Sequence, residues 1–148
     1  MLEIQTRCHA DDTAEVYTEV ALDAEQRDKG RQKLVAANGE ELRLFLERGK
    51  ALQIGELLKA DDGKLVRVIG ADEAVCEASC DDWQQFAKAC YHLGNRHVRM
   101  QIGAKWLRIK PDHVLEELIE LLGLKLRHLK CIFEPESGAY SSHGHHHH

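Results

Sequence analysis

No stretch of this chain approaches the roughly 20 consecutive apolar residues of a membrane-spanning helix, and its first residues lack the charged segment and apolar run of a secretory signal. We therefore expect a cytoplasmic protein with no membrane contact. An excess of basic residues is also missing, because 20 lysines and arginines stand against 25 aspartates and glutamates, a formal net charge of −5. Affinity for phosphate backbones comes mainly from a basic surface, so nucleic acid is not an expected partner.

Motifs of enzyme active sites are missing as well. There is no Gly-x-Ser-x-Gly nucleophile motif, no glycine-rich phosphate loop, and no serine with a histidine and an aspartate at a recognisable spacing. The paired acids Asp61 and Asp62 fall in a predicted turn, and Glu116 and Glu117 fall on the solvated face of a predicted helix. The sequence therefore predicts that the protein is not an enzyme.

The five cysteines form no Cys-x-x-Cys pair. An odd number of scattered cysteines in a reducing compartment indicates free thiols. Cys90 and Cys131 lie among apolar residues and are predicted to be small buried side chains rather than metal ligands. Cys76 and Cys80 would be adjacent as an i, i+4 pair only on a helix, and their segment is predicted to be a strand.

The first half of the 148 residues is predicted to be a small all-β domain. Apolar residues alternate from Val16 to Leu22 and from Leu42 to Leu46, and Asn38-Gly39 supplies a turn. Two apolar runs within residues 56–70 flank Asp62-Gly63 and predict a hairpin.

A short linker at Ile69–Asp72 follows that hairpin and ends a predicted first domain of residues 1–71. Within this domain Arg27, Lys29, Arg31 and Lys33 alternate, which places four cations on one face of a predicted extended segment. That face is predicted to be a solvated strand surface or a docking surface for an acidic partner.

The second half alternates between strands and helices. The predicted elements are strand 74–79, a helix that Asp81 and Asp82 begin and Gly94 ends, strands 98–102 and 105–109, a helix from Pro111-Asp112 to Gly123, and strand 124–133. This βαββαβ order over residues 72–135 is that of ferredoxin-like folds, in which two helices cover one face of a four-stranded antiparallel sheet. The predicted fold class is therefore α+β.

The predicted helices each have an apolar face. The residues expected to point inward are Trp83, Phe86, Ala87 and Cys90 on the first helix and Val114, Leu115, Leu118, Ile119 and Leu122 on the second. Residues 136–148 lose this periodicity and are predicted to be a disordered, histidine-rich tail.

Histidines are concentrated in that tail, whose last six residues contain His143, His145, His146, His147 and His148. Neutral imidazole suits nickel, zinc and copper, so metal handling is the first functional hypothesis. A terminal histidine run is also what an expression tag looks like. Here the run is interrupted by glycine and no engineered linker or protease site precedes it.

Three further histidines lie at the ends of predicted elements. His92 and His97 flank the turn expected at Gly94 and are predicted ligands in an exposed connection. His113 begins the second helix, where the partial positive charge of a helix N-terminus disfavours a cation, and is predicted to be an accessory ligand. His9 and His128 are predicted to be structural.

Several segments of the chain closely resemble the UreE family of urease accessory proteins. They are Tyr91-His92-Leu93-Gly94-Asn95-Arg96-His97 with the two residues before it, Leu44–Gly49, Asp112–Leu115 and Phe133–Tyr140. The resemblance implies a nickel metallochaperone that delivers nickel to apo-urease. It implies a peptide-binding-like β domain, a ferredoxin-like metal-binding domain, and a homodimer that works with a partner GTPase and other accessory proteins of urease.

In that family the histidine matching His97 is the central nickel ligand, and two copies meet across the dimer axis, so one histidine per chain supplies two ligands. His92 and His113 match peripheral positions. Some members carry another histidine two residues before the one matching His113, where this chain has Pro111. Tail imidazoles are expected to complete the coordination shell, and zinc and copper are expected to compete in vitro.

Two other functions stay open on the sequence alone. A histidine-rich nickel store without a dedicated client would need only the tail. A metal-independent interaction module with an artificial tail would need no ligand at all. Both functions predict that His97 is dispensable.

Overall fold

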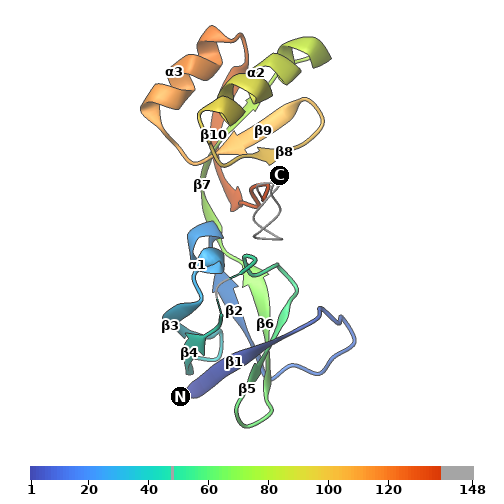
Figure 1. Cartoon of the computed structure of the whole chain (residues 1–148), viewed down its shortest axis with the longest axis vertical. Coiled ribbons are helices and arrows are strands. Elements are labelled where there is room, and N and C mark those ends of the chain that lie inside the picture. Colours follow the sequence, from blue (N-terminus) through green and yellow to red (C-terminus); the bar gives the residue numbers. More distant parts are fainter. Residues whose placement is uncertain (48, 138–148) are drawn as a thin grey trace, which may run out of the picture. The chain divides into compact units, whose positions relative to one another are not determined.

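The structure, a computed structural model, describes residues 1–47 and 49–137 (Figure 1). They form two compact units, Met1–Ala71 and Asp72–Ser137. The first is mostly β and the second combines helices with strands, which confirms the predicted α+β class. No helix among the described residues is long and apolar enough to cross a membrane. The predicted tail lies outside the described residues, apart from its first two.

The first unit is one mixed sheet with a short helix. Its elements are β1 (Leu2–Cys8), β2 (Thr18–Leu22), α1 (Ala24–Asp28), β3 (Arg31–Val35), β4 (Glu41–Phe45), β5 (Leu57–Ala60) and β6 (Leu65–Gly70). The strand order is β2-β6-β5-β1-β4-β3, with β1 parallel to β4 and β2 parallel to β6. Alternate residues such as Ile4, Leu44 and Val66 are fully buried in its core. The predicted hairpin is present as the antiparallel pair β5–β6.

The prediction that four alternating cations lie on one extended segment is wrong. Asp23 begins helix α1 through a capping box with Gln26, so the chain from Ala24 onward is helical rather than extended. Arg27 is buried and donates from Nη1 to the carbonyl oxygen of Leu22 at 2.7 Å. Only the last two cations of the set lie on strand β3, where both are exposed.

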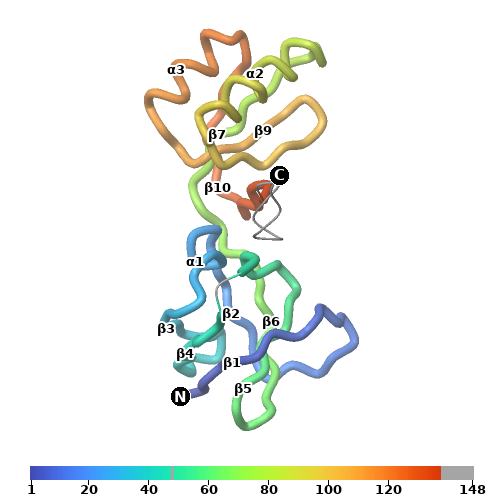
Figure 2. Tube along the Cα trace, in the orientation of Figure 1, coloured from blue at the N-terminus to red at the C-terminus, as the bar shows by residue number. Residues whose placement is uncertain are grey.

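The second unit has the predicted order of strands and helices, and its chain path can be followed in Figure 2. Its elements are β7 (Asp72–Ser79), α2 (Trp83–Asn95), β8 (Gln101–Ile102), β9 (Trp106–Ile109), α3 (His113–Leu121) and β10 (Lys125–Ile132). The sheet order is β10-β7-β9-β8, and all neighbours are antiparallel. The pairing of β7 with β10 is the longest in the unit, from Lys125 opposite Ser79 to Ile132 opposite Asp72.

Both helices cover the same face of this sheet (Figure 1). The core between helices and sheet consists mainly of Cys76, Ala78, Leu107 and Ile109 from the strands, Phe86, Ala89 and Leu93 from α2, and Ile119 from α3. The predicted inward face of α2 is therefore partly wrong, since Trp83 and Ala87 are exposed. Trp83 is the first residue of α2, and its ring packs edge-on against the ring of Phe86. Val114, in the first turn of α3, is also exposed rather than inward.

The two helices begin as predicted. The Asp82 carboxylate accepts from the N–H of Gln85, and the Asp112 carboxylate accepts from the N–H of Leu115. Helix α3 also ends as predicted, because Gly123 adopts a φ of +89°.

The end of α2 differs from the prediction. Gly94 is not among the glycines with positive φ, and the helix continues through Asn95. Gly94 is therefore part of the helix, and the chain reverses at a later residue.

Two glycine-to-alanine substitutions should have opposite effects on the free energy of unfolding. In Gly123→Ala a Cβ would enter left-handed backbone and overlap the Gln85 amide, so we expect a loss of about 1–2 kcal/mol. In Gly94→Ala the Cβ meets nothing within 4 Å, so we expect a gain of up to about 1 kcal/mol. Urea unfolding followed by circular dichroism measures both values. A Gly123→Ala variant as stable as the parent would contradict this description of the helix end.

Candidate metal centre

His97 reverses the chain after helix α2. Its N–H donates to the carbonyl oxygen of Gly94 at 3.0 Å, and the N–H of Val98 donates to that of Leu93 at 3.3 Å. These two bonds form a Schellman motif, in which the residue after the helix cap adopts the left-handed conformation. His97 has that conformation, with a φ of +57°.

Glycine is the usual residue at this position, and Gly123 occupies the equivalent position at the end of α3. A side chain in left-handed backbone costs about 1 kcal/mol relative to glycine. The His97 side chain is exposed, so it does not regain this energy by burial. Local stability therefore does not account for a histidine here, which makes His97 a candidate functional residue.

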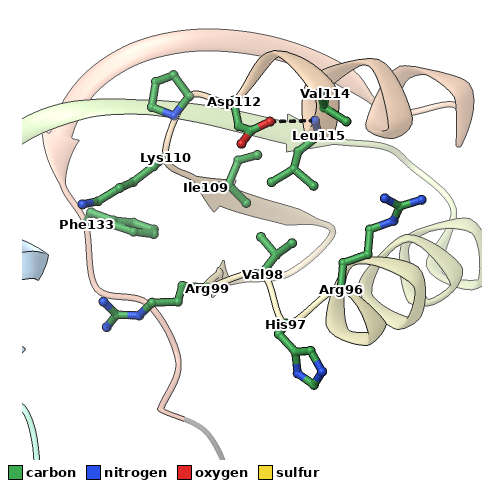
Figure 3. Close-up of a pocket in the computed structure, with 11 residues that line it drawn as sticks. Arg96, His97, Val98, Arg99, Ile109, Lys110, Asp112, Val114, Leu115 and Phe133 are labelled. Carbon is green, nitrogen blue, oxygen red and sulfur yellow. Dashed lines mark hydrogen bonds between the residues drawn. The ribbon is translucent and has the colours of Figure 1, made fainter.

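An open pocket of about 590 Å³ lies beside His97. Its residues are Arg96, His97, Val98, Arg99, Ile109, Lys110, Pro111, Asp112, Val114, Leu115 and Phe133. Figure 3 shows apolar side chains in the middle of this group, basic side chains around them, and the His97 ring pointing away from the apolar ones.

Three basic residues, Arg96, Arg99 and Lys110, line the pocket together with one carboxylate, that of Asp112. That carboxylate is also engaged as the cap of α3. The His97 imidazole points away from the middle of this pocket (Figure 3).

The other two predicted ligands in the described residues are exposed but stand apart. His92 lies in the last turn of α2, where its ring meets that of Tyr91 edge-on at 5.3 Å. His113 is the first residue of α3, next to Asp112. Within residues 1–47 and 49–137, His92, His97 and His113 do not belong to any group of three close metal-binding side chains. The predicted tail ligands, His143 and His145 to His148, lie outside the described residues.

The described residues do bring together a different set, Cys76, Glu116 and His128, whose donor atoms all lie within 4.8 Å of one another. His128 stands directly opposite Cys76 in the β7–β10 ladder. His128 Nε2 lies 2.7 Å from Glu116 Oε1. Burial, and the carboxylate of Glu116 after it, raise the pKa of the Cys76 thiol to about 11.

This cluster was missed by the sequence analysis, which treated Cys76 as a strand residue and His128 as structural. Its members are separated by 40 and 12 positions, so no spacing motif marks them. Pairing the predicted strands 74–79 and 124–133 in the correct register would have placed Cys76 beside His128.

The other cysteines are free thiols, as predicted. Cys90 and Cys131 are half-buried rather than buried, which corrects the prediction for both. Cys90 packs at the margin of the core under α2, whereas Cys131 lies on the sheet face opposite the helices.

Comparisons with known proteins match both units. The model of the UreE urease accessory protein N-terminal domain matches residues 1–71, and that of its C-terminal domain matches residues 73–148. A protein named urease accessory protein UreE from Marinomonas sp. (strain MWYL1) is 61% identical over 143 residues, 97% of this chain and 94% of the relative. Relatives of the same name from Alteromonas mediterranea and Psychromonas ingrahamii are 51% and 48% identical, over 86% and 90% of this chain and 83% and 89% of their own lengths.

Replacing His97 by glycine should not lower stability. Relief of the left-handed strain, about 1 kcal/mol, offsets the greater backbone freedom of glycine in the unfolded chain. His92→Gly is the matched control, because it puts glycine into ordinary helical backbone and should cost about 1 kcal/mol. Thermal unfolding measures both. If His97→Gly lowers the melting temperature as much as His92→Gly, the imidazole supports the fold and the inference of a functional residue fails.

Proposed function

The chain belongs to the UreE family of urease accessory proteins, and on that premise we propose that it is a nickel metallochaperone, which delivers nickel to apo-urease during active-site assembly. Nickel is then the cargo of the protein rather than a resident cofactor. An accessory protein assists the assembly of another protein, which agrees with the prediction that this one is not an enzyme.

The observation that carries this proposal is the position of His97. The imidazole of His97 is exposed, and the backbone that carries it is held in a left-handed turn by two backbone hydrogen bonds. It would be a ligand attached at a defined point but open to solvent. Such a ligand can pass an ion to another protein by exchange, whereas a closed thiolate cage would retain it. The exposed setting therefore supports delivery.

One imidazole does not hold a divalent ion tightly, so a second copy of the chain is part of the proposal. A residue near a two-fold axis occurs twice, and two His97 side chains would share one nickel ion. The pocket beside His97 has an apolar middle and an exposed Val114 at its edge, a surface that a second copy would cover. These features support a homodimer formed through the second unit.

The remaining predicted ligands are proposed to act around that centre. His92 and His113 are exposed and would act as peripheral ligands, and the tail histidines His143, His145, His146, His147 and His148 would complete the shell and add capacity. Copper outranks nickel for nitrogen ligands, and zinc also binds imidazole, so both would compete in vitro. Selectivity would therefore come from metal supply and from the protein that receives the ion.

The two units would have different roles in nickel delivery. We infer that residues 72–135 are a ferredoxin-like metal-binding domain, which the βαββαβ order and the sheet order β10-β7-β9-β8 support. Residues 1–71 would be the peptide-binding-like domain, which contacts the urease apoprotein, the urease GTPase accessory protein or the other accessory proteins in the cytoplasm.

Delivery and storage are separated by the variant His97→Gly. We expect urease activation in a nickel-limited reconstitution to fall roughly tenfold or more, because loss of a metal-site residue costs at least that much in affinity. The tail would still bind nickel, so total nickel content falls less than activation does. The measurement is urease activity after reconstitution at equal nickel, with His9→Ala, an exposed residue of the first unit, as the control. Activation equal to that of the parent would instead favour a nickel store.

The tail should add capacity without creating the transferable site. A chain that ends at Ser142 should bind fewer nickel ions per dimer but keep at least one, because His97 lies in the folded second unit. Equilibrium dialysis with nickel analysis of the parent and the shortened chain measures the difference. Complete loss of nickel binding by the shortened chain would contradict a site centred on His97.

A further inference from the structure

We propose that Cys76, Glu116 and His128 form a second metal site, separate from His97, that binds one zinc-class divalent cation. Nickel delivery does not depend on this site, because none of its three residues is a proposed nickel ligand. The site lies within the second unit.

Three elements of the fold bring the donors together. Cys76 on β7 and His128 on β10 are direct partners in an antiparallel ladder, so both side chains point to the same face of the sheet. That face is the one that the helices cover, because Cys76 belongs to the core with residues of α2 and α3. Glu116, in the first turn of α3, reaches down to the same point.

The carboxylate of Glu116 is already oriented. Its Oε2 accepts the N–H of Asp112 at 2.9 Å, while its Oε1 lies 2.7 Å from Nε2 of His128. Its side chain is only 17% exposed, so it has little freedom to turn away. A carboxylate held in this manner is a ligand that loses little conformational entropy when an ion binds.

The donor set suits zinc. Thiolate, imidazole and carboxylate are the three ligand types that zinc takes in proteins, and three protein ligands leave the fourth position of a tetrahedron to water. The His128 side chain is 60% exposed, which gives the ion and that water a route to the site. Once the thiol has lost its proton, Cys76 and Glu116 together carry two negative charges, which balance the two positive charges of the cation.

Binding must remove one proton, which passes from the Cys76 sulfur to solvent as the metal–sulfur bond forms. Without metal the thiol is buried and its pKa is about 11, so it is protonated at neutral pH. The ion therefore competes with a proton for this sulfur.

A metal-free alternative is that His128 and Glu116 form only a surface ion pair above an inert thiol.

Cobalt titration of the full-length, metal-free protein separates these alternatives. Cobalt replaces zinc, and a cobalt–thiolate bond gives a charge-transfer absorption in the near ultraviolet. Sites made of imidazole alone, at His97 or in the tail, do not give this band. We expect the band to reach its maximum at one cobalt ion per chain and to disappear when zinc is added.

The variants assign the band to residues. Cys76→Ser should abolish it, and His128→Ala should weaken cobalt binding at this site roughly tenfold or more. Cys131→Ser is the matched control, because Cys131 is on β10 but on the opposite face of the sheet, and this variant should keep the band.

The proposal is overturned if the parent shows no thiolate band, or if Cys76→Ser keeps it. Circular dichroism checks that Cys76→Ser is folded, since this residue is buried. If Cys76→Ser does not fold, His128→Ala is the test, because His128 is exposed. An unchanged cobalt affinity in His128→Ala then overturns the proposal. None of these results bears on His97, so a failure here leaves nickel delivery to be judged by urease activation.

Discussion

The left-handed turn at His97 is the constraint on which the account of this protein depends. Two backbone hydrogen bonds close the end of α2 around a residue with a φ of +57°. The same motif ends α3, where glycine adopts the conformation without strain. Compared with glycine at the same position, the histidine adds an exposed imidazole and no stability.

That turn also determines what surrounds the imidazole. The residues on either side of it line a pocket with an apolar middle and mostly basic side chains around it. In the proposed function a single chain is an incomplete metal site. Two copies across a symmetry axis, with ligands from a histidine-rich tail, would supply what one chain lacks, and an ion could leave a site shared in this manner.

Local signals allowed much of the second unit to be predicted from the sequence. Asp82 and Asp112 are good helix caps, and Gly123 is the residue type that a left-handed helix end requires, so both helix starts and one helix end were correct. Gly94 is the same residue type but lies inside a helix. The hydrogen bonds that close α2 one turn later, and not the presence of a glycine, decide where the chain reverses.

Other errors have causes that a sequence does not display. Alternating cations favoured an extended segment, but the Asp23–Gln26 capping box starts a helix there and buries Arg27. The cluster of Cys76, Glu116 and His128 depends on the register of two strands that are about 50 positions apart, which no local pattern specifies. His97 was predicted to be a ligand because it lies in a motif, whereas its left-handed backbone was not foreseen.

The central claim is that two copies of His97 share one transferable nickel ion. Anomalous diffraction at the nickel edge from crystals of the nickel-loaded dimer tests it most directly. The account predicts one strong peak on the two-fold axis, about 2.1 Å from an imidazole nitrogen of each His97. A nickel peak that lies away from both His97 side chains, with none on the axis, would contradict it.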